Sequence, residues 1–588
     1  MLRSGACLAA ALLAGAAAPV YADDAGPLAW VYIEANTGGS SGGHVALRVA
    51  DTVYHVQQAP GGLFELNRDE WTTFRHLYAG LQNRTLALAE LDMSADDVER
   101  VERRLAKAFV TQRAELDRRR QLALDVTWIE SWREGHPPPA LAGAGLLAPA
   151  ARDPDAEALR ARVYEVHGGD FLARELARVE AELAAFEPGR GEGGLEPLRE
   201  ALLLREALLA LEQSAPLAEA ALLHFEGLLA EPLTHAEREA ARAFAGAQQE
   251  AALALLASQR PDRARPLLLA LARHQALARS AASGNLVLLD PYAGLDALPP
   301  EGEGTSPSAA AKLAGELAPL VRKGRTQVLA GSDYDETRYN LLELGAAVLA
   351  EFERGARGAP VRKLPRHASP AAPRVVAFAP RATPEALARA QATAERALEA
   401  QEERLAARYA YGVVRRNCVT ELARLLNDSF PPADVARALG AELEPGAGLG
   451  FIPFAFFDEA KARLRVGELA EVASHREHEL ARLSREAPGL GTRVAESMTL
   501  TSSIYTPRPR DSTFLFFTDG VFWRRPLLGL ANLGYAAGSS VVGLATAPFD
   551  GGERLRAAGA GVWYSLPELA FFNIRKGTFE YVPAQAQE

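Results

Sequence analysis

The sequence predicts an α+β protein, in which an antiparallel sheet and a functional helix are separated along the chain by a large all-helical insertion. Residues 28–92 are rich in β-branched and aromatic residues, bounded by glycine-containing turns. Residues 94–285 are dominated by Ala, Leu, Glu and Arg, with apolar residues three and four positions apart, as in amphipathic helices. A further amphipathic helix is expected much later in the chain, at 419–426.

The length and composition are those of a large globular protein. The chain has 588 residues, of which 48% are hydrophobic and 24% charged, enough for about two to four domains with well-formed cores. Its formal net charge of −11 argues against nucleic acid as the main partner. The sequence contains no Walker loop, no dinucleotide-binding glycine pattern and no zinc motif, and the chemistry predicted below requires no metal or organic cofactor.

Residues 1–22 have the features of a bacterial export signal. A short basic start precedes a stretch of Ala and Leu at 8–19, and small residues end at Ala22, where we expect cleavage. Cys7 would leave with this leader, so the mature chain would keep a single cysteine and have no internal disulfide. The periplasm or cell envelope, with possible association with a membrane, is therefore the expected location.

The first zone, 28–92, is expected to supply the N-terminal strands of the core. Strands are predicted at 30–33, 44–49, 52–57 and 83–91, because β-formers are concentrated there. The two central strands flank a short polar turn and therefore predict a β-hairpin.

The helical insertion, 94–285, begins with a clear helix start. Ser94 is a suitable N-cap, and the carboxylates of Asp96 and Asp97 favour the positive end of a helix. Proline and glycine clusters at 137–139 and 188–194 are expected to divide the insertion into helical blocks.

Residues 286–435 are expected to combine a linker region with helices that complete the core. A loop rich in Gly, Pro and Ser covers 297–308, and a proline-rich linker covers 359–373. Helices are predicted at 336–353 and 384–409, and the second leads into the segment that carries the remaining cysteine.

Cys418 is the strongest candidate for a nucleophile. Asn417 is a suitable N-cap, which would place Cys418 in the first turn of a helix, where the helix dipole stabilises a thiolate and the Cys418 backbone N–H can serve an oxyanion. Arg415 and Arg416 add positive charge nearby or could hold an anionic substrate. The alternative is an inert thiol buried on an ordinary helix.

Two histidines on the predicted hairpin supply a partner for this thiol. If Ala50 and Asp51 form a two-residue turn, Ala46 faces His55, and His44 lies on the same side of the sheet as Ala46. His44 and His55 would then be diagonal neighbours, within reach of each other. A three-residue turn would place them on opposite faces, and His44 alone could be an ordinary surface histidine.

The segment 43–56, Gly-His-Val-Ala-Leu-Arg-Val-Ala-Asp-Thr-Val-Tyr-His-Val, followed by Ala59-Pro60, resembles the histidine hairpin of lecithin–retinol acyltransferase-like enzymes. These are circularly permuted papain-like thiol enzymes, in which a later Asn-Cys pair opens a helix, as Asn417-Cys418 does here. The whole chain looks similar to exported bacterial proteins with the Lnb-type periplasmic domain, named after a lipoprotein N-acyltransferase.

The resemblance implies a permuted papain-like core with Cys418 as nucleophile, His44 as general base and acid, and His55 as the group that orients His44. Tyr411, Asn417 and Arg416 are weaker candidates for contacts to the substrate or its oxyanion. The chain departs from the family in two ways. The insertion between His55 and Cys418 is very long, and Val-Thr follows the cysteine where some relatives have a histidine.

Three classes of function follow from this interpretation. The first is a cysteine acyltransferase or deacylase that forms a thioester from a lipoprotein or phospholipid ester. The second is a papain-like peptidase or amidase that acts on cell-wall peptides. The third is a non-catalytic periplasmic scaffold, whose helical insertion would bind partners.

The C-terminal region, 436–588, contains an uncharged run at 526–549 that is long enough to cross a bilayer. Trp523 and two following arginines flank it as interfacial residues would, and Gly534 and Gly538 form a pair of small residues one helical turn apart. Because Gly, Ala and Ser are frequent in this run, a buried helical hairpin or a segment on the membrane surface explains it equally well.

Overall fold

The structure, a computed structural model, describes most of the chain after residue 26. The described residues are 27–34, 43–59, 61–75, 78–79, 84–148, 152–189, 194–224, 230–298, 307–331, 333–362, 369–444, 450–505, 507, 511–518, 522–570 and 576. The predicted export signal at 1–22, including Cys7, lies outside them, as does most of the predicted loop at 297–308.

The chain forms two compact units, which are described separately. The sheet unit comprises the residues up to Leu116 and those from Glu403 to Val582, and the helical unit runs from Asp117 to Glu402. Two long helices, α3 (Ala95–Glu134) and α11 (Pro384–Tyr409), each have residues in both units. The fold is therefore α+β, and the helical unit contains, besides its helices, only one short two-stranded ribbon among the described residues.

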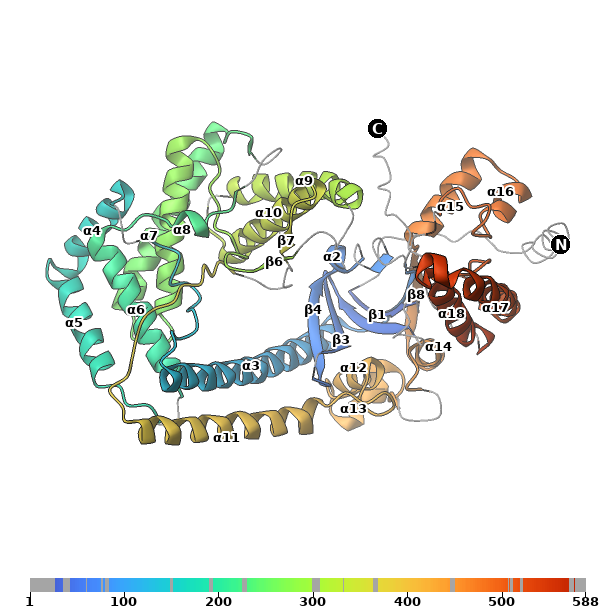
Figure 1. Cartoon of the computed structure of the whole chain (residues 1–588), viewed down its shortest axis with the longest axis horizontal. Coiled ribbons are helices and arrows are strands. Elements are labelled where there is room, and N and C mark those ends of the chain that lie inside the picture. Colours follow the sequence, from blue (N-terminus) through green and yellow to red (C-terminus); the bar gives the residue numbers. More distant parts are fainter. Residues whose placement is uncertain are drawn as a thin grey trace. The chain divides into compact units, whose positions relative to one another are not determined.

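The sheet unit is built on six antiparallel strands in the order β4-β3-β2-β1-β5-β8 (Figure 1). Their bounds are β1 Leu28–Ile33, β2 His44–Val49, β3 Thr52–Gln58, β4 Phe64–Glu70, β5 Leu86–Leu91 and β8 Val466–Val472. The first four strands in the chain form a meander, which makes most of the pairings local. β8 joins the edge of the sheet from almost four hundred residues downstream.

Each face of this sheet is covered by different helices. One face packs against α12 (Cys418–Asn427) and α14 (Pro453–Arg463), which contact β1, β2 and β3. Its core contains Val45, Leu47, Val49, Tyr54, Val419, Leu422 and Phe456. The opposite face carries the short helix α2 (Trp71–Arg75) and a second core, which contains Ala29, Val31, Ile33, Ala46, Val53, Phe74 and Tyr78. The period-two alternation along each strand separates these two cores.

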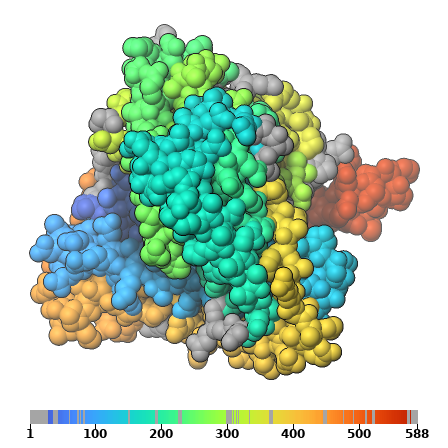
Figure 2. Space-filling view, turned by 90° about the vertical axis from the view of Figure 1, so that its left-hand side faces the viewer, coloured from blue at the N-terminus to red at the C-terminus, as the bar shows by residue number. Residues whose placement is uncertain are grey.

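The helical unit is held together by two apolar cores. Its helices, besides parts of α3 and α11, are α4 Pro154–His167, α5 Phe171–Ala184, α6 Glu196–Gln213, η2 Glu219–Ala221, α7 His235–Ala257, α8 Ala264–Ser283, α9 Pro307–Leu329 and α10 Glu336–Ala356. Figure 2 looks onto this unit, with the teal helices α4 to α6 toward the viewer. A two-stranded ribbon of β6 (Ala297–Leu298) and β7 (Val361–Arg362) completes the unit.

The remaining helices of the sheet unit come after α12 in the chain. They are α13 Pro432–Leu439, α15 His475–Glu486, α16 Leu490–Ala495, η4 Phe522–Arg524, α17 Arg525–Asp550, α18 Glu553–Ser565 and η5 Pro567–Ala570. The helices α17 and α18 pack side by side as a hairpin (Figure 1).

Most predicted elements are present, with shifted bounds. The two hairpin strands and the helix at 384–409 lie where the sequence predicts them, and Ser94 accepts a hydrogen bond from the Asp97 amide at the start of α3. The predicted strand at 83–91 begins at Leu86, and residue 83 lies outside the described part. The predicted loop at 297–308 gives way at Pro307 to α9, which the sequence analysis missed, as it missed β8.

Candidate active site

The hairpin of β2 and β3 has the predicted two-residue turn. Ala46 pairs with His55, and Ala50 adopts a positive φ of 49°, as turns of this kind require. His44 therefore lies diagonally opposite His55 on the same face. Nε2 of His44 lies 3.2 Å from Nδ1 of His55, so the two imidazoles are joined by a hydrogen bond.

A carboxylate extends this pair into a chain of three groups. Nε2 of His55 lies 2.8 Å from Oδ2 of Asp69, which projects from β4. His55 is fully buried, and the rings of Phe74 and Tyr78 pack edge-on against it. The carboxylate accepts the His55 Nε2 proton, so Nδ1 of His55 accepts from Nε2 of His44. This tautomer leaves Nδ1 of His44 as the basic nitrogen of the chain.

Cys418 is the first residue of α12, as predicted. The side-chain oxygen of Asn417 accepts hydrogen bonds from the amides of Val419 (2.9 Å) and Thr420 (3.0 Å). The Thr420 hydroxyl accepts from the Asn417 amide in return, which completes a capping box. The cap fixes the residue at which the helix begins, and it therefore fixes the position of the thiol at the positive end of α12.

A short turn between α11 and α12 ties the cysteine segment to the sheet. The Tyr411 amide donates a 2.8 Å hydrogen bond to the carbonyl of Gly62, in the connection between β3 and β4. Gly412 and Arg416 then pair through two backbone hydrogen bonds, which close the turn just before the cap. These contacts bring a cysteine that lies hundreds of residues downstream against the strands that carry the histidines.

The thiol is buried and uncharged in this structure. Cys418 is 8% exposed, and the backbone amides of Val45, Val419 and Cys418 itself lie near its sulfur. Burial is the largest influence on the thiol and raises the pKa of Cys418 to about 11, although these amides act in the opposite direction. The helix N-terminus and the nearby cation were expected to favour the thiolate, but in this resting state burial outweighs them and the pKa of the thiol is raised.

The contact with Val45 places the sulfur next to the histidine chain but on the other face of the sheet. Val45 points into the core beneath α12, whereas the neighbouring His44 shares its face with Ala46. His44 is the first residue of β2 and follows Gly43, which has a φ of +85°. The sulfur therefore lies near the residue that follows His44 at the beginning of β2.

The cation near the thiol is Arg84, and this corrects the expectation for the two arginines before the helix. Arg84 lowers the pKa of Cys418, and burial in turn lowers the pKa of Arg84 itself. Its side chain donates to the carbonyls of Ile33 and Glu34. Arg415 is exposed, and Arg416 donates to the Ala407 carbonyl at the end of α11, because the turn before the cap directs it there.

The side chains predicted to contact the substrate differ in how many hydrogen bonds they already make within the protein. The side-chain nitrogen of Asn417 donates to the carbonyls of Val413 and Phe451, and its oxygen caps α12, so both polar atoms stabilise the fold. Tyr411 is half-buried, and its pKa is raised by burial and then by the nearby Cys418. Tyr411 is therefore the predicted side chain that can best contact a substrate at the sulfur.

Asp69 and Arg84 were missed by the sequence analysis. A signal for Asp69 existed, because residues 64–70 alternate in character and their pairing with β3 puts Asp69 on the His55 face. Arg84 lies within the strand predicted at 83–91, but β5 begins only at Leu86, so Arg84 belongs to the preceding connection and no sequence pattern linked it to the thiol. Among the described residues, no group of three or more His, Cys, Asp or Glu side chains is arranged to hold a metal ion.

Comparison of the chain with protein-family models, with curated proteins and with solved structures gave no match.

Proposed function

We propose that this chain is an exported cysteine acyl-transfer enzyme with a permuted papain-like core, acting on an ester of a lipoprotein or a phospholipid. One observation carries the proposal: the hydrogen-bonded series from Asp69 through His55 ends at His44, which precedes Val45, and the Val45 backbone amide lies near the Cys418 sulfur. An oriented imidazole pair, of which His55 is buried, beside a thiol at a helix N-terminus has the parts of a nucleophile–base–orienter constellation.

The high pKa of the thiol favours general-base catalysis over a preformed ion pair. When a carbonyl enters, Nδ1 of His44 takes the proton of Cys418 as the sulfur–carbon bond forms. The His44 imidazolium is stabilised through His55 by the carboxylate of Asp69. The developing oxyanion is held by amides at the beginning of α12, where the helix dipole also favours negative charge.

The second half of the reaction returns every group to its starting state. The tetrahedral intermediate breaks its carbon–oxygen bond, and the leaving alcohol takes the proton from His44, which leaves a thioester on Cys418. An amine or water then attacks the thioester while His44 accepts its proton. The sulfur leaves as thiolate and is protonated again by His44. No other co-reactant is needed for acyl transfer or hydrolysis.

A trapping experiment tests this proposal. The purified chain is incubated with a short-chain activated ester, acid-quenched and analysed by intact-protein mass spectrometry. We expect an acyl adduct that maps to Cys418 and disappears on treatment with hydroxylamine. The Cys418→Ala variant should form none. An adduct of equal yield in Cys418→Ala, or no adduct in either protein, would contradict the proposal.

A non-catalytic role is the second candidate, and the burial of Cys418 favours it. A thiol with a pKa of about 11 and 8% exposure has the properties of a small core residue. On that account the hydrogen-bonded histidines would stabilise the hairpin only. The same experiment separates the two, because a structural thiol forms no thioester.

A further inference from the structure

The long helix α17 has an inverted distribution of polarity. Its buried residues recur every three, four or seven positions and form one narrow stripe against the protein: Arg525, Gly529, Asn532, Ala536 and Gly543. The stripe thus contains an arginine, an asparagine and two glycines. In a water-exposed helix the buried side is the apolar one, so this arrangement is the reverse of the usual pattern.

The buried side is fixed by a polar network. Asn532 accepts from the amides of Leu515 and Phe516, and it donates to the Phe516 carbonyl and to Glu568. Glu568 is fully buried and pairs with Lys576. The hairpin partner α18 packs closely, because an added Cβ at Gly543 would meet the backbone of Leu555 at 2.8 Å. This face of α17 is therefore committed to the protein.

The opposite side of α17 is exposed and entirely apolar. Its exposed positions are Leu527, Leu530, Gly534, Ala537, Gly538, Val541, Val542, Leu544, Ala545, Pro548 and Phe549. Several of these side chains are highly exposed, including Val541 at 72% and Phe549 at 90%. Two tryptophans of this region are also exposed, Trp523 just before α17 and Trp563 on α18. We call this surface the apolar face of the hairpin.

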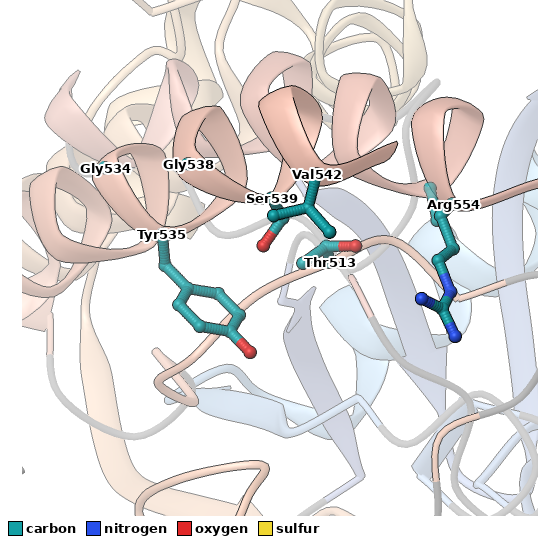
Figure 3. Close-up of a pocket in the computed structure, with 8 residues that line it drawn as sticks. Thr513, Gly534, Tyr535, Gly538, Ser539, Val542 and Arg554 are labelled. Atoms are coloured by element: carbon teal, nitrogen blue, oxygen red, sulfur yellow. The ribbon is translucent and has the colours of Figure 1, made fainter. Parts of the chain in front are cut away.

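A groove crosses part of this surface. It has a volume of about 510 Å³, and Thr513, Gly534, Tyr535, Gly538, Ser539, Val542, Arg554 and Ala557 line it. Figure 3 shows the Tyr535 hydroxyl and the Arg554 guanidinium at opposite ends, with Ser539 and Val542 between them. The two glycines lack side chains to fill the groove. A largely apolar channel with a cation at one end matches an acyl chain with an anionic headgroup.

A lipid surface fits the apolar face better than a protein partner does. Protein interfaces are polar over roughly 40% of their area, and homodimer interfaces over roughly a third, and both have a polar rim. Here, every exposed position from Leu527 to Phe549 is apolar, whereas Arg525 and Asn532 of the same helix are buried. Tryptophans at the margins and arginines near the helix ends are typical of a membrane interface.

The hairpin is better suited to lie on a bilayer than to cross it. With 26 residues, α17 is about 39 Å long and could span a hydrocarbon core of roughly 30 Å. Its partner α18 has only 13 residues, about 20 Å, and carries Glu553, Arg554 and Arg556 in its first turn. A pair in which one member is too short and charged cannot cross together without placing these charges in hydrocarbon.

We propose that the α17–α18 hairpin docks the protein on a phospholipid bilayer, with its apolar face in the interface and an acyl chain in the groove beside Arg554. The inference goes beyond the proposed acyl transfer and does not depend on it. A catalytically inert protein with this hairpin would dock in the same way.

Tryptophan fluorescence of the full mature chain tests the proposal. Trp523 and Trp563 are 63% and 68% exposed, whereas Trp30, Trp71 and Trp128 are buried and Trp132 is half-buried, so a change in emission on adding vesicles reports mainly on the hairpin. We expect a blue shift when vesicles of phosphatidylethanolamine and phosphatidylglycerol are added. Bromines near the headgroup end of the acyl chains should quench more strongly than bromines at the bilayer centre. Stronger quenching from the centre would contradict docking on the surface.

Flotation with the same vesicles supplies the matched comparison. The double variant Val541→Glu/Leu544→Glu should lose about tenfold or more of its vesicle binding, since each charge enters the interface. Val110→Glu/Leu341→Glu, at similarly exposed sites outside the hairpin, should float as the parent does. Thermal unfolding curves of all three establish that they are folded. Equal flotation of the two double variants, or a parent that dimerises and does not float, would overturn the proposal.

Discussion

The two faces of the six-stranded sheet differ in chemistry, although they share the same strands. On one face Val45, Leu47 and Tyr54 form a dry core beneath α12, and the Cys418 thiol belongs to it. On the other, His44 and His55 continue through a hydrogen bond to a carboxylate. A two-residue turn sets which residues reach which face, so a one-residue change in register would exchange the two sets.

The thiol on one face and the histidine pair on the other can meet only where the strand begins. Along the strand interior the sheet separates thiol and imidazole, and only at the beginning of β2 do they come from adjacent residues, through the contact of Val45 with the sulfur. The dry face raises the pKa of the thiol, while the polar face supplies a base oriented for a proton. The proposed catalysis therefore requires the imidazole of His44 on one face to act on the thiol of Cys418 on the other.

The largest effect is expected from removing the base. His44→Gln keeps a polar side chain but has no basic nitrogen, so acylation of Cys418 by an activated ester should slow by about 10²- to 10⁴-fold. Stopped-flow measurement of the acyl adduct checks this. The control is His136→Gln, at an exposed histidine that pairs with Glu134 in the helical unit. If both variants acylate at the parent rate, the two faces do not cooperate.

A smaller effect on the rate of acylation is expected from changing Asp69, which is hydrogen-bonded to His55. Asp69 contacts His55 and acts on the thiol only through two imidazoles, so it is a positioning residue. Asp69→Asn should reverse the donor and acceptor order of the histidines and slow acylation by about ten- to a hundredfold.

The pH profile separates this positioning role from a loss of folding. The limb of the acylation profile that reports His44 should shift in Asp69→Asn, whereas Asp170→Asn, at the exposed residue that precedes α5, should leave it unchanged. A slower rate with an unshifted profile would assign Asp69 a merely structural role.

The last prediction concerns stability rather than rate, and it tests the dry face alone. The folded pKa of Cys418 is about 11 against an ordinary value of 9.0, so the unfolded chain ionises first as the pH rises. Stability from the neutral thiol is present below pH 9 and is lost between pH 9 and 11, by about 3 kcal/mol. Denaturant unfolding of the parent and of Cys418→Ala measures it. Parallel losses in the two proteins would show that the thiol does not titrate in this way.

The parts of the site that the sequence predicted are those fixed by local geometry. A two-residue turn determines which residues of β2 and β3 are opposite, and an Asn before an apolar-periodic segment determines where α12 begins, so the hairpin register and the Asn417 cap are confirmed. Both rest on contacts between residues at most eleven positions apart. The α+β class follows in the same way from the alternation and periodicity of separate segments.

The parts that were missed depend on contacts between distant segments. Asp69 becomes part of the site through the pairing of β4 with β3, and Arg84 comes from the connection before β5. The arginines before the helix were expected near the thiol because they are adjacent in sequence, yet the turn from Gly412 to Arg416 directs them away. The raised pKa of Cys418 follows from burial by residues that no local pattern identifies.

The most direct test of cooperation between the faces is the rate at which Cys418 reacts with chloroacetamide between pH 5 and 10. We predict that the parent reacts measurably at neutral pH, with a rate that levels off once His44 is deprotonated. In His44→Gln the rate should be far lower at neutral pH and should rise about tenfold per pH unit, as for an isolated thiol with a pKa of about 11. Identical profiles in the two proteins would contradict the account.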